Sequence, residues 1–127
     1  MGHFNKLTPA EAERLSILAE ECAEVIQVIG KIQRHGFDSC HPNGGPNNRS
    51  LLEKELGDVS AAKYLMLESG DVDDDAIGQG FTDKIFSIPR YLHHNKHLFP
   101  DYRQTDNQDR ERCCGDCDMP ITECDCN

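Results

Sequence analysis

The chain has 127 residues, of which 37% are hydrophobic and 28% charged, a composition that suits one small soluble domain. Its 23 acidic residues against 13 basic ones give a formal net charge of −10. This excess argues against a surface that binds nucleic acid, because such surfaces cluster lysine and arginine. No apolar run approaches the roughly 18 residues that a membrane helix needs, and residues 1–7 lack the character of a signal peptide. We therefore expect a cytoplasmic protein with no membrane and no nucleic-acid partner.

The first predicted element is a long helix over residues 8–35. Its start, Thr8-Pro9-Ala10-Glu11, combines an N-cap threonine, a proline at the first helical position and a glutamate at the third. Hydrophobic residues recur at helical spacing as far as Ile32, and Gly36 follows a basic last turn as a typical stop. Residues 36–50 hold three glycines, two prolines and three asparagines, and therefore predict a long loop.

Three shorter helices are expected after this loop. The second helix opens with a capping-box pattern at Ser50-Leu51-Leu52-Glu53 and runs to about Gly70. The third is short and follows an acidic turn at residues 71–75, whereas the fourth covers residues 81–96 with a kink near Pro89. Because the sequence shows no strand pattern and no repeat, the predicted fold class is all-α, built as a four-helix bundle.

The end of the chain differs in composition from the rest. Residues 101–127 form a polar linker and a cysteine-rich tail, outside the helical domain expected over residues 1–100. Four of the cysteines have the spacing of a minimal zinc knuckle, namely Cys114, Cys117, Cys124 and Cys126. Such a knuckle would hold a structural Zn²⁺. The alternative is an acidic tail that carries reduced thiols, and the sequence leaves both open.

Two acidic residues of the second helix occupy positions that should face the core. Glu55 and Asp58 lie about 60° apart in helical projection, on the side that carries most apolar residues of this helix. A buried carboxylate needs a compensating positive charge. A salt bridge to Lys31 or Lys63 would supply one. A divalent cation would supply another, held together with the glutamates of the first helix, Glu20, Glu21 and Glu24.

These acids carry a family resemblance. Glu20-Glu21-Cys22-Ala23-Glu24 and Glu55-Leu56-Gly57-Asp58 match an EExxE…ExxD signature. The chain thereby resembles the MazG-like nucleoside triphosphate pyrophosphohydrolases, which are all-α. Residues 31–36 and 90–94 are similar to segments of the short, phage-type branch, in which MazZ-like enzymes are found. The resemblance covers residues 8–96. The separation of the two halves of the signature is slightly longer than usual, and the loop absorbs the excess.

The resemblance implies an activity and a set of site residues. The activity is the metal-dependent hydrolysis of a nucleoside triphosphate to the monophosphate and pyrophosphate. Mg²⁺ or Mn²⁺ would be held by Glu21, Glu24, Glu55 and Asp58, and catalysis would involve Glu20 and Glu21, with Glu20 orienting ligands or a water. The phage-type segments favour a purine deoxynucleotide, with dGTP as the first expectation. The resemblance also implies a homodimer or homotetramer, located in the host cytoplasm if the protein is encoded by a phage.

A triphosphate substrate also needs polar contacts from the protein. Lys31 and Arg34 continue the acidic stripe along the first helix. Lys84 and Arg90 are candidates from the last part of the domain, and Asn48 is a candidate from the long loop. For each of these residues, an ordinary surface role is the alternative.

A second functional hypothesis is an interaction protein whose zinc knuckle carries the function while its helices only dimerise. It predicts that removal of residues 101–127 abolishes function, whereas Glu55→Gln has little effect. The enzyme hypothesis predicts the reverse. A third possibility is a structural bundle in which Glu55 and Asp58 are paired with lysines, and in that case added Mg²⁺ would not raise the melting temperature.

Overall fold

A computed structural model of the chain describes residues 4–99. Within these residues the chain forms three α-helices and two short 3₁₀ helices, and the only strand-like pairing is a single bridge between Cys40 and Asn47. The all-α fold class is therefore confirmed. The chain divides into two compact units, residues 1–74 and 75–127, and each unit is described by itself. None of the described helices has the length and hydropathy needed to cross a membrane.

Helix α1 spans Pro9–His35, as its sequence predicts. The capping box is complete: the Glu11 backbone N–H donates to Thr8 Oγ1 at 3.2 Å, and the Thr8 backbone N–H donates to the Glu11 carboxylate at 2.6 Å. Together they satisfy two of the free N–H groups at the helix start. The helix ends at Gly36, which has a φ of 86° and donates its N–H to the Ile32 carbonyl at 2.7 Å.

Helix α2 spans Asn48–Glu68 and begins earlier than predicted. The expected N-cap at Ser50 is wrong, because Asn47 takes that role: its side-chain oxygen accepts the Ser50 backbone N–H at 2.9 Å. Asparagine is as good an N-cap as serine. A second contact fixes the early start, since the buried Asn48 side chain donates to the Gly36 carbonyl at 2.9 Å.

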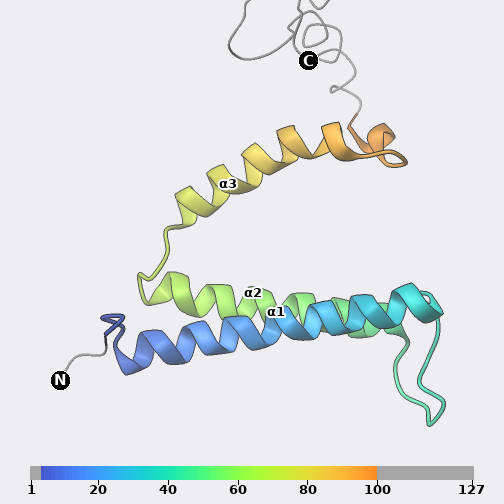
Figure 1. Cartoon of the computed structure of the whole chain (residues 1–127), viewed down its shortest axis with the longest axis horizontal. Coiled ribbons are helices and arrows are strands. Elements are labelled where there is room, and N and C mark those ends of the chain that lie inside the picture. Colours follow the sequence, from blue (N-terminus) through green and yellow to red (C-terminus); the bar gives the residue numbers. More distant parts are fainter. Residues whose placement is uncertain (1–3, 100–127) are drawn as a thin grey trace, which may run out of the picture. The chain divides into compact units, whose positions relative to one another are not determined.

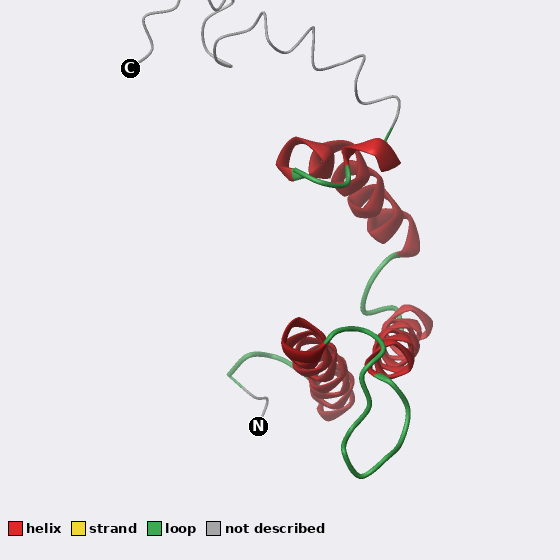
Figure 2. Ribbon diagram, turned by 90° about the vertical axis from the view of Figure 1, so that its right-hand side faces the viewer, coloured by secondary structure: helices red, strands yellow, loops and turns green. Residues whose placement is uncertain are grey.

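Helices α1 and α2 form an antiparallel hairpin and lie side by side (Figures 1 and 2). The buried apolar residues between them are few, namely Val28, Ala62 and Met66. At the open end of the hairpin, Arg14 binds Asp71 through two hydrogen bonds, at 2.5 and 2.9 Å. At the other end, the loop closes on itself because the backbone N–H groups of Asn48 and Arg49 bind carbonyls at its start. The two ends hold the middle of the hairpin in register.

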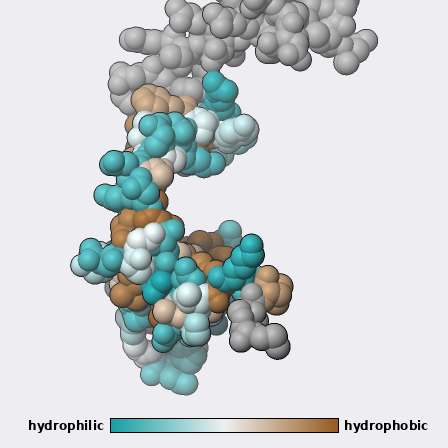
Figure 3. Space-filling view, turned by 90° about the vertical axis from the view of Figure 1, so that its left-hand side faces the viewer, coloured by the Kyte–Doolittle hydropathy of each residue, from teal (hydrophilic) through white to brown (hydrophobic). Residues whose placement is uncertain are grey.

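A stripe of apolar side chains on α1 stays exposed. Leu15, Ile26 and Ile29 lie within about 60° of one another in helical projection, and Ile26 is 69% exposed. Exposed apolar residues also occur on α2, among them Leu56 and Leu65. In Figure 3, hydrophobic surface in brown lies among hydrophilic side chains in teal. Two packed helices can bury only the faces that they turn to each other, so this hairpin leaves apolar surface uncovered.

The second unit holds all but the first residue of α3, Asp74–Ser87, followed by the 3₁₀ helices η1, Ile88–Tyr91, and η2, Lys96–Leu98. The prediction of a short third helix and a separate fourth helix over residues 81–96 is wrong. Instead α3 continues through both of its glycines and stops at Ser87. Pro89 explains the stop, because it lacks an N–H group and disfavours the α conformation of the residue before it. Pro89 is itself fully buried, in η1.

Candidate metal centre

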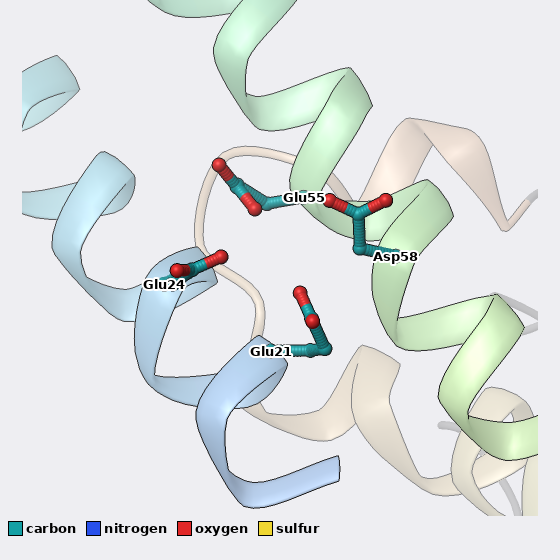
Figure 4. A group of neighbouring side chains, drawn as sticks. All are labelled: Glu21, Glu24, Glu55 and Asp58. Atoms are coloured by element: carbon teal, nitrogen blue, oxygen red, sulfur yellow. The ribbon is translucent and has the colours of Figure 1, made fainter. Parts of the chain in front are cut away.

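Four carboxylates from the two helices of the hairpin meet in one place (Figure 4). Glu21 and Glu24 are three residues apart on α1, and Glu55 and Asp58 are three residues apart on α2, so each pair lies on one face of its helix. One oxygen atom of each residue lies within 4.8 Å of one oxygen of every other. We call these four residues the acid cluster. The structure thus brings together all four residues expected from the sequence as metal ligands.

The acid cluster is partly shielded from solvent. Glu55 is only 8% exposed, and Glu21, Glu24 and Asp58 are half-buried. One oxygen of Glu21, Oε2, is buried and has no hydrogen-bond partner. Leaving a buried acceptor without a partner costs about 1–3 kcal/mol. A cation bound to this oxygen would remove that cost. An oxygen-only donor set of this kind suits Mg²⁺ or Mn²⁺ better than a softer metal ion. The residues present therefore fit a hard divalent cation.

Within the acid cluster, Glu55 is the residue that most affects the pKa of Glu24. A hydrogen bond from Glu24 to the Glu55 carboxylate, together with the negative charge of Glu55, raises the pKa of Glu24. Such a hydrogen bond between two carboxyl groups requires a proton on one of them, which is why the contact raises the pKa of Glu24. A divalent cation would also reduce the repulsion between these two carboxyl groups, because it would neutralise the negative charge on their facing oxygens.

Lys54 supplies positive charge to the acid cluster. Its Nζ donates to Asp58 Oδ2 at 2.6 Å and lies 3.3 and 3.4 Å from the two oxygens of Glu55. These carboxylates raise the pKa of Lys54. The salt-bridge alternative predicts Lys31 or Lys63 as the partner of Glu55 and Asp58. In the structure the partner is Lys54. Sequence reasoning missed this residue, although its position four residues before Asp58 is a usual spacing of a helical ion pair.

Other predicted residues of the first unit lie outside the acid cluster. Glu20 is exposed on α1. Lys31 is half-buried and Arg34 is exposed, one and two turns further along α1 from Gln27. Asn48 is 6% exposed and its amide is used to hold the loop to the end of α1, so we do not retain it as a nucleotide contact.

The remaining predicted residues lie in the second unit or beyond the described part of the chain. Lys84 is in the last turn of α3, and Arg90 is exposed in η1. The four cysteines of the predicted zinc knuckle, residues 114, 117, 124 and 126, lie outside the described residues.

Comparisons with known proteins add no family. No protein-family model, curated protein or solved structure matches the chain. The features of the chain that bear on its function are the acid cluster and the sequence signature that predicts it.

Proposed function

We propose that this protein is a metal-dependent nucleoside triphosphate pyrophosphohydrolase of the MazG-like kind. The observation that carries the proposal is the acid cluster: Glu21 and Glu24 from one helix face Glu55 and Asp58 from another, with one oxygen of each within 4.8 Å of the others. The buried, unpartnered oxygen of Glu21 adds to this support, because a cation would satisfy it.

The proposed reaction is the attack of water on the α-phosphorus of the substrate. A new bond forms between the water oxygen and the α-phosphorus, and the bond from that phosphorus to the oxygen bridging to the β-phosphate breaks. The products are a nucleoside monophosphate and pyrophosphate. A divalent cation, when bound, supplies charge neutralisation of the phosphates and makes water easier to deprotonate. The four acids would hold the cation. Glu20, next to Glu21 on α1, would orient water or a ligand.

Positively charged residues along α1 would contact the phosphate groups of the triphosphate. Lys31 lies seven residues beyond Glu24 and therefore on nearly the same side of the helix, about 10 Å further along its axis. Side chains on a helix lean towards its start, which favours a contact between Lys31 and a phosphate beside Glu24, and Arg34 extends the positive charge by another turn. These two residues are the proposed phosphate contacts of the first unit, whereas Lys84 and Arg90, in the second unit, stay predictions from the sequence. We propose a purine deoxynucleotide, with dGTP as the first candidate.

The proposed protein is a homodimer or homotetramer that acts in the cytoplasm. The exposed apolar stripe of Leu15, Ile26 and Ile29 on α1 supports self-association, because such a stripe is costly to leave in water. This stripe lies on the flank of α1 opposite to Gln27 and Lys31, so assembly through it would leave the polar flank beside the acid cluster open to substrate.

The test is pyrophosphate release from a panel of nucleoside and deoxynucleoside triphosphates, with Mg²⁺ or Mn²⁺, for the wild type and Glu55→Gln. The matched control is Glu53→Gln, which makes the same change at an exposed position of the same helix, outside the acid cluster. We expect turnover that requires the metal and falls at least about a hundredfold in Glu55→Gln, since even the outer partners of metal ligands are worth 10–100-fold. Glu53→Gln should keep wild-type turnover.

Two results would refute the proposal. One is the absence of turnover on every nucleotide from a folded, metal-loaded sample. The other is turnover that Glu55→Gln leaves unchanged.

A further inference from the structure

We propose that Lys54 is the resident counter-cation of the acid cluster, which a divalent cation has to displace in order to bind. Lys54 would thereby set the affinity of the site for metal. This inference rests on the proposed function, because it takes the acid cluster as the metal site.

The geometry places Lys54 in competition with a metal ion. Its Nζ lies 2.6 Å from Asp58 Oδ2 and 3.3–3.4 Å from both oxygens of Glu55. An ammonium group has three N–H donors and no acceptor, so all of its contacts here occupy carboxylate lone pairs. A divalent cation at the same oxygens needs those lone pairs at about 2.0–2.6 Å. Two of the four proposed ligands therefore cannot serve Lys54 and the metal fully at once.

Lys54 is also free to leave. Its side chain is 60% exposed, whereas the side chain of Glu55 is only 11% exposed. The ammonium group stands at the end of a flexible four-carbon chain, so it can swing into solvent while the glutamate stays in place. Repulsion between the ammonium and a doubly charged ion a few ångströms away would favour this movement. The acid cluster then exchanges one positive charge for two.

This exchange predicts opposite effects of Lys54 on the empty and the occupied site. In the metal-free protein, Lys54 offsets repulsion between Glu55 and Asp58 and so stabilises the fold. In the presence of metal, the ion pairs that must first break reduce the measured affinity. Removal of the lysine charge should therefore destabilise the metal-free protein and tighten metal binding.

The experiment measures Mn²⁺ affinity of the full chain by isothermal titration calorimetry, without nucleotide. Lys54→Met removes the charge and keeps most of the apolar stem. Its matched control is Lys63→Met, the same change on the same helix about 13 Å further along the axis, a distance beyond the screening length at physiological salt. Asp58→Asn removes a proposed ligand and identifies binding at the acid cluster.

We expect Lys54→Met to bind Mn²⁺ about tenfold more tightly than the wild type, the scale of a charge interaction at a partly exposed site. The gain should shrink at high salt, and Lys63→Met should match the wild type. The melting temperature in a chelator should be lower for Lys54→Met, and Mn²⁺ should raise it by more than in the wild type.

Two failures are distinguishable. If the wild type binds Mn²⁺, Asp58→Asn weakens it and Lys54→Met binds with equal or lower affinity, then Lys54 is not displaced by the metal and only this inference is overturned. If Asp58→Asn binds Mn²⁺ as well as the wild type, or neither binds it, the acid cluster is not a metal site and the proposed function fails with the inference.

Discussion

Glu24 and Glu55 show how one pair of residues can make the stability of the metal-free protein depend on pH. Their carboxyl groups face each other across the hairpin, and the contact raises the pKa of Glu24 above its ordinary value of 4.5. A carboxyl group whose pKa is raised by folding contributes its full stability below pH 4.5. That contribution is lost as the pH rises through the pKa of the folded protein, because the proton has to leave.

Glu24→Gln should remove this loss. Glutamine keeps a hydrogen-bond donor towards Glu55 and carries no charge at any pH, so the metal-free variant should resist the fall in stability that the wild type shows above pH 4.5. The measurement is the melting temperature in a chelator from pH 4.5 to 7.5. A wild-type curve parallel to that of the variant over this range would show that the pair does not hold a proton.

The ion pair between Arg14 and Asp71 has the opposite dependence on pH. The Arg14 guanidinium, which binds both carboxylate oxygens, lowers the pKa of Asp71 below its ordinary value of 3.8. Stability from this contact is present above pH 3.8 and is lost as the pH falls through the lowered pKa. The two effects occupy different pH ranges, so the Glu24 variant can be interpreted without interference from Asp71.

At the scale of the helices, two of the glycines in the hairpin, Gly36 and Gly57, should respond in opposite ways to alanine. Gly36 ends α1 with a φ of 86°, a conformation that costs other residues about 1–2 kcal/mol. Gly57 is inside α2, where alanine is the better residue by about 0.5–1 kcal/mol. A β-carbon at either position would meet no atom within 4 Å, so backbone conformation alone decides the outcome.

We therefore expect Gly36→Ala to lower the free energy of unfolding by about 1–2 kcal/mol and Gly57→Ala to raise it by about 0.5–1 kcal/mol. Chemical denaturation of both variants beside the wild type measures the difference. Equal effects of the two changes would contradict the positive φ of Gly36 at the end of α1.

The accuracy of sequence-based prediction also differs between helices. Helix α1 was predictable because its cap, its apolar spacing and its glycine stop all lie within the helix or next to it. The start of α2 was not, because two asparagines and a serine within four residues can all cap a helix, and the choice of Asn47 depends on the packing of Asn48 against the end of α1. The division of residues 71–96 is wrong because α3 runs without a break through Gly78 and Gly80, and because it ends before Pro89, where only a kink is expected from the sequence.

The acid cluster was predictable for a related reason. The spacing of Glu21 and Glu24 puts both on one face of α1, and the spacing of Glu55 and Asp58 does the same on α2. Only the approach of the two pairs depends on how the helices pack in the hairpin. Lys54 escaped prediction because an exposed lysine on a helix is ordinary by sequence. Only the distances to Glu55 and Asp58 show that it takes part.

At the scale of the whole molecule, the exposed apolar stripe on α1 predicts self-association. Ile26 is 69% exposed, and a charged residue there should break an interface that covers it. We expect the wild type to sediment as a dimer or tetramer at micromolar concentration and Ile26→Glu to sediment as a smaller species. The control is Gln27→Glu, which adds the same charge at the next position, on the polar flank of the helix. A monomeric wild type in analytical ultracentrifugation would contradict the predicted assembly.

The hairpin is fastened at both ends, by the peptide chain at the loop and by the Arg14–Asp71 contact at the opposite end. The loop around Gly44 and Gly45 contributes none of the four acids, and each helix carries two of them. The chain could therefore be cut in this loop without removing any of the four acids. Cleavage of the loop would yield two pieces, each with half of the carboxylates and neither able to assemble the site alone, and the acid cluster would exist only while the two helices are associated.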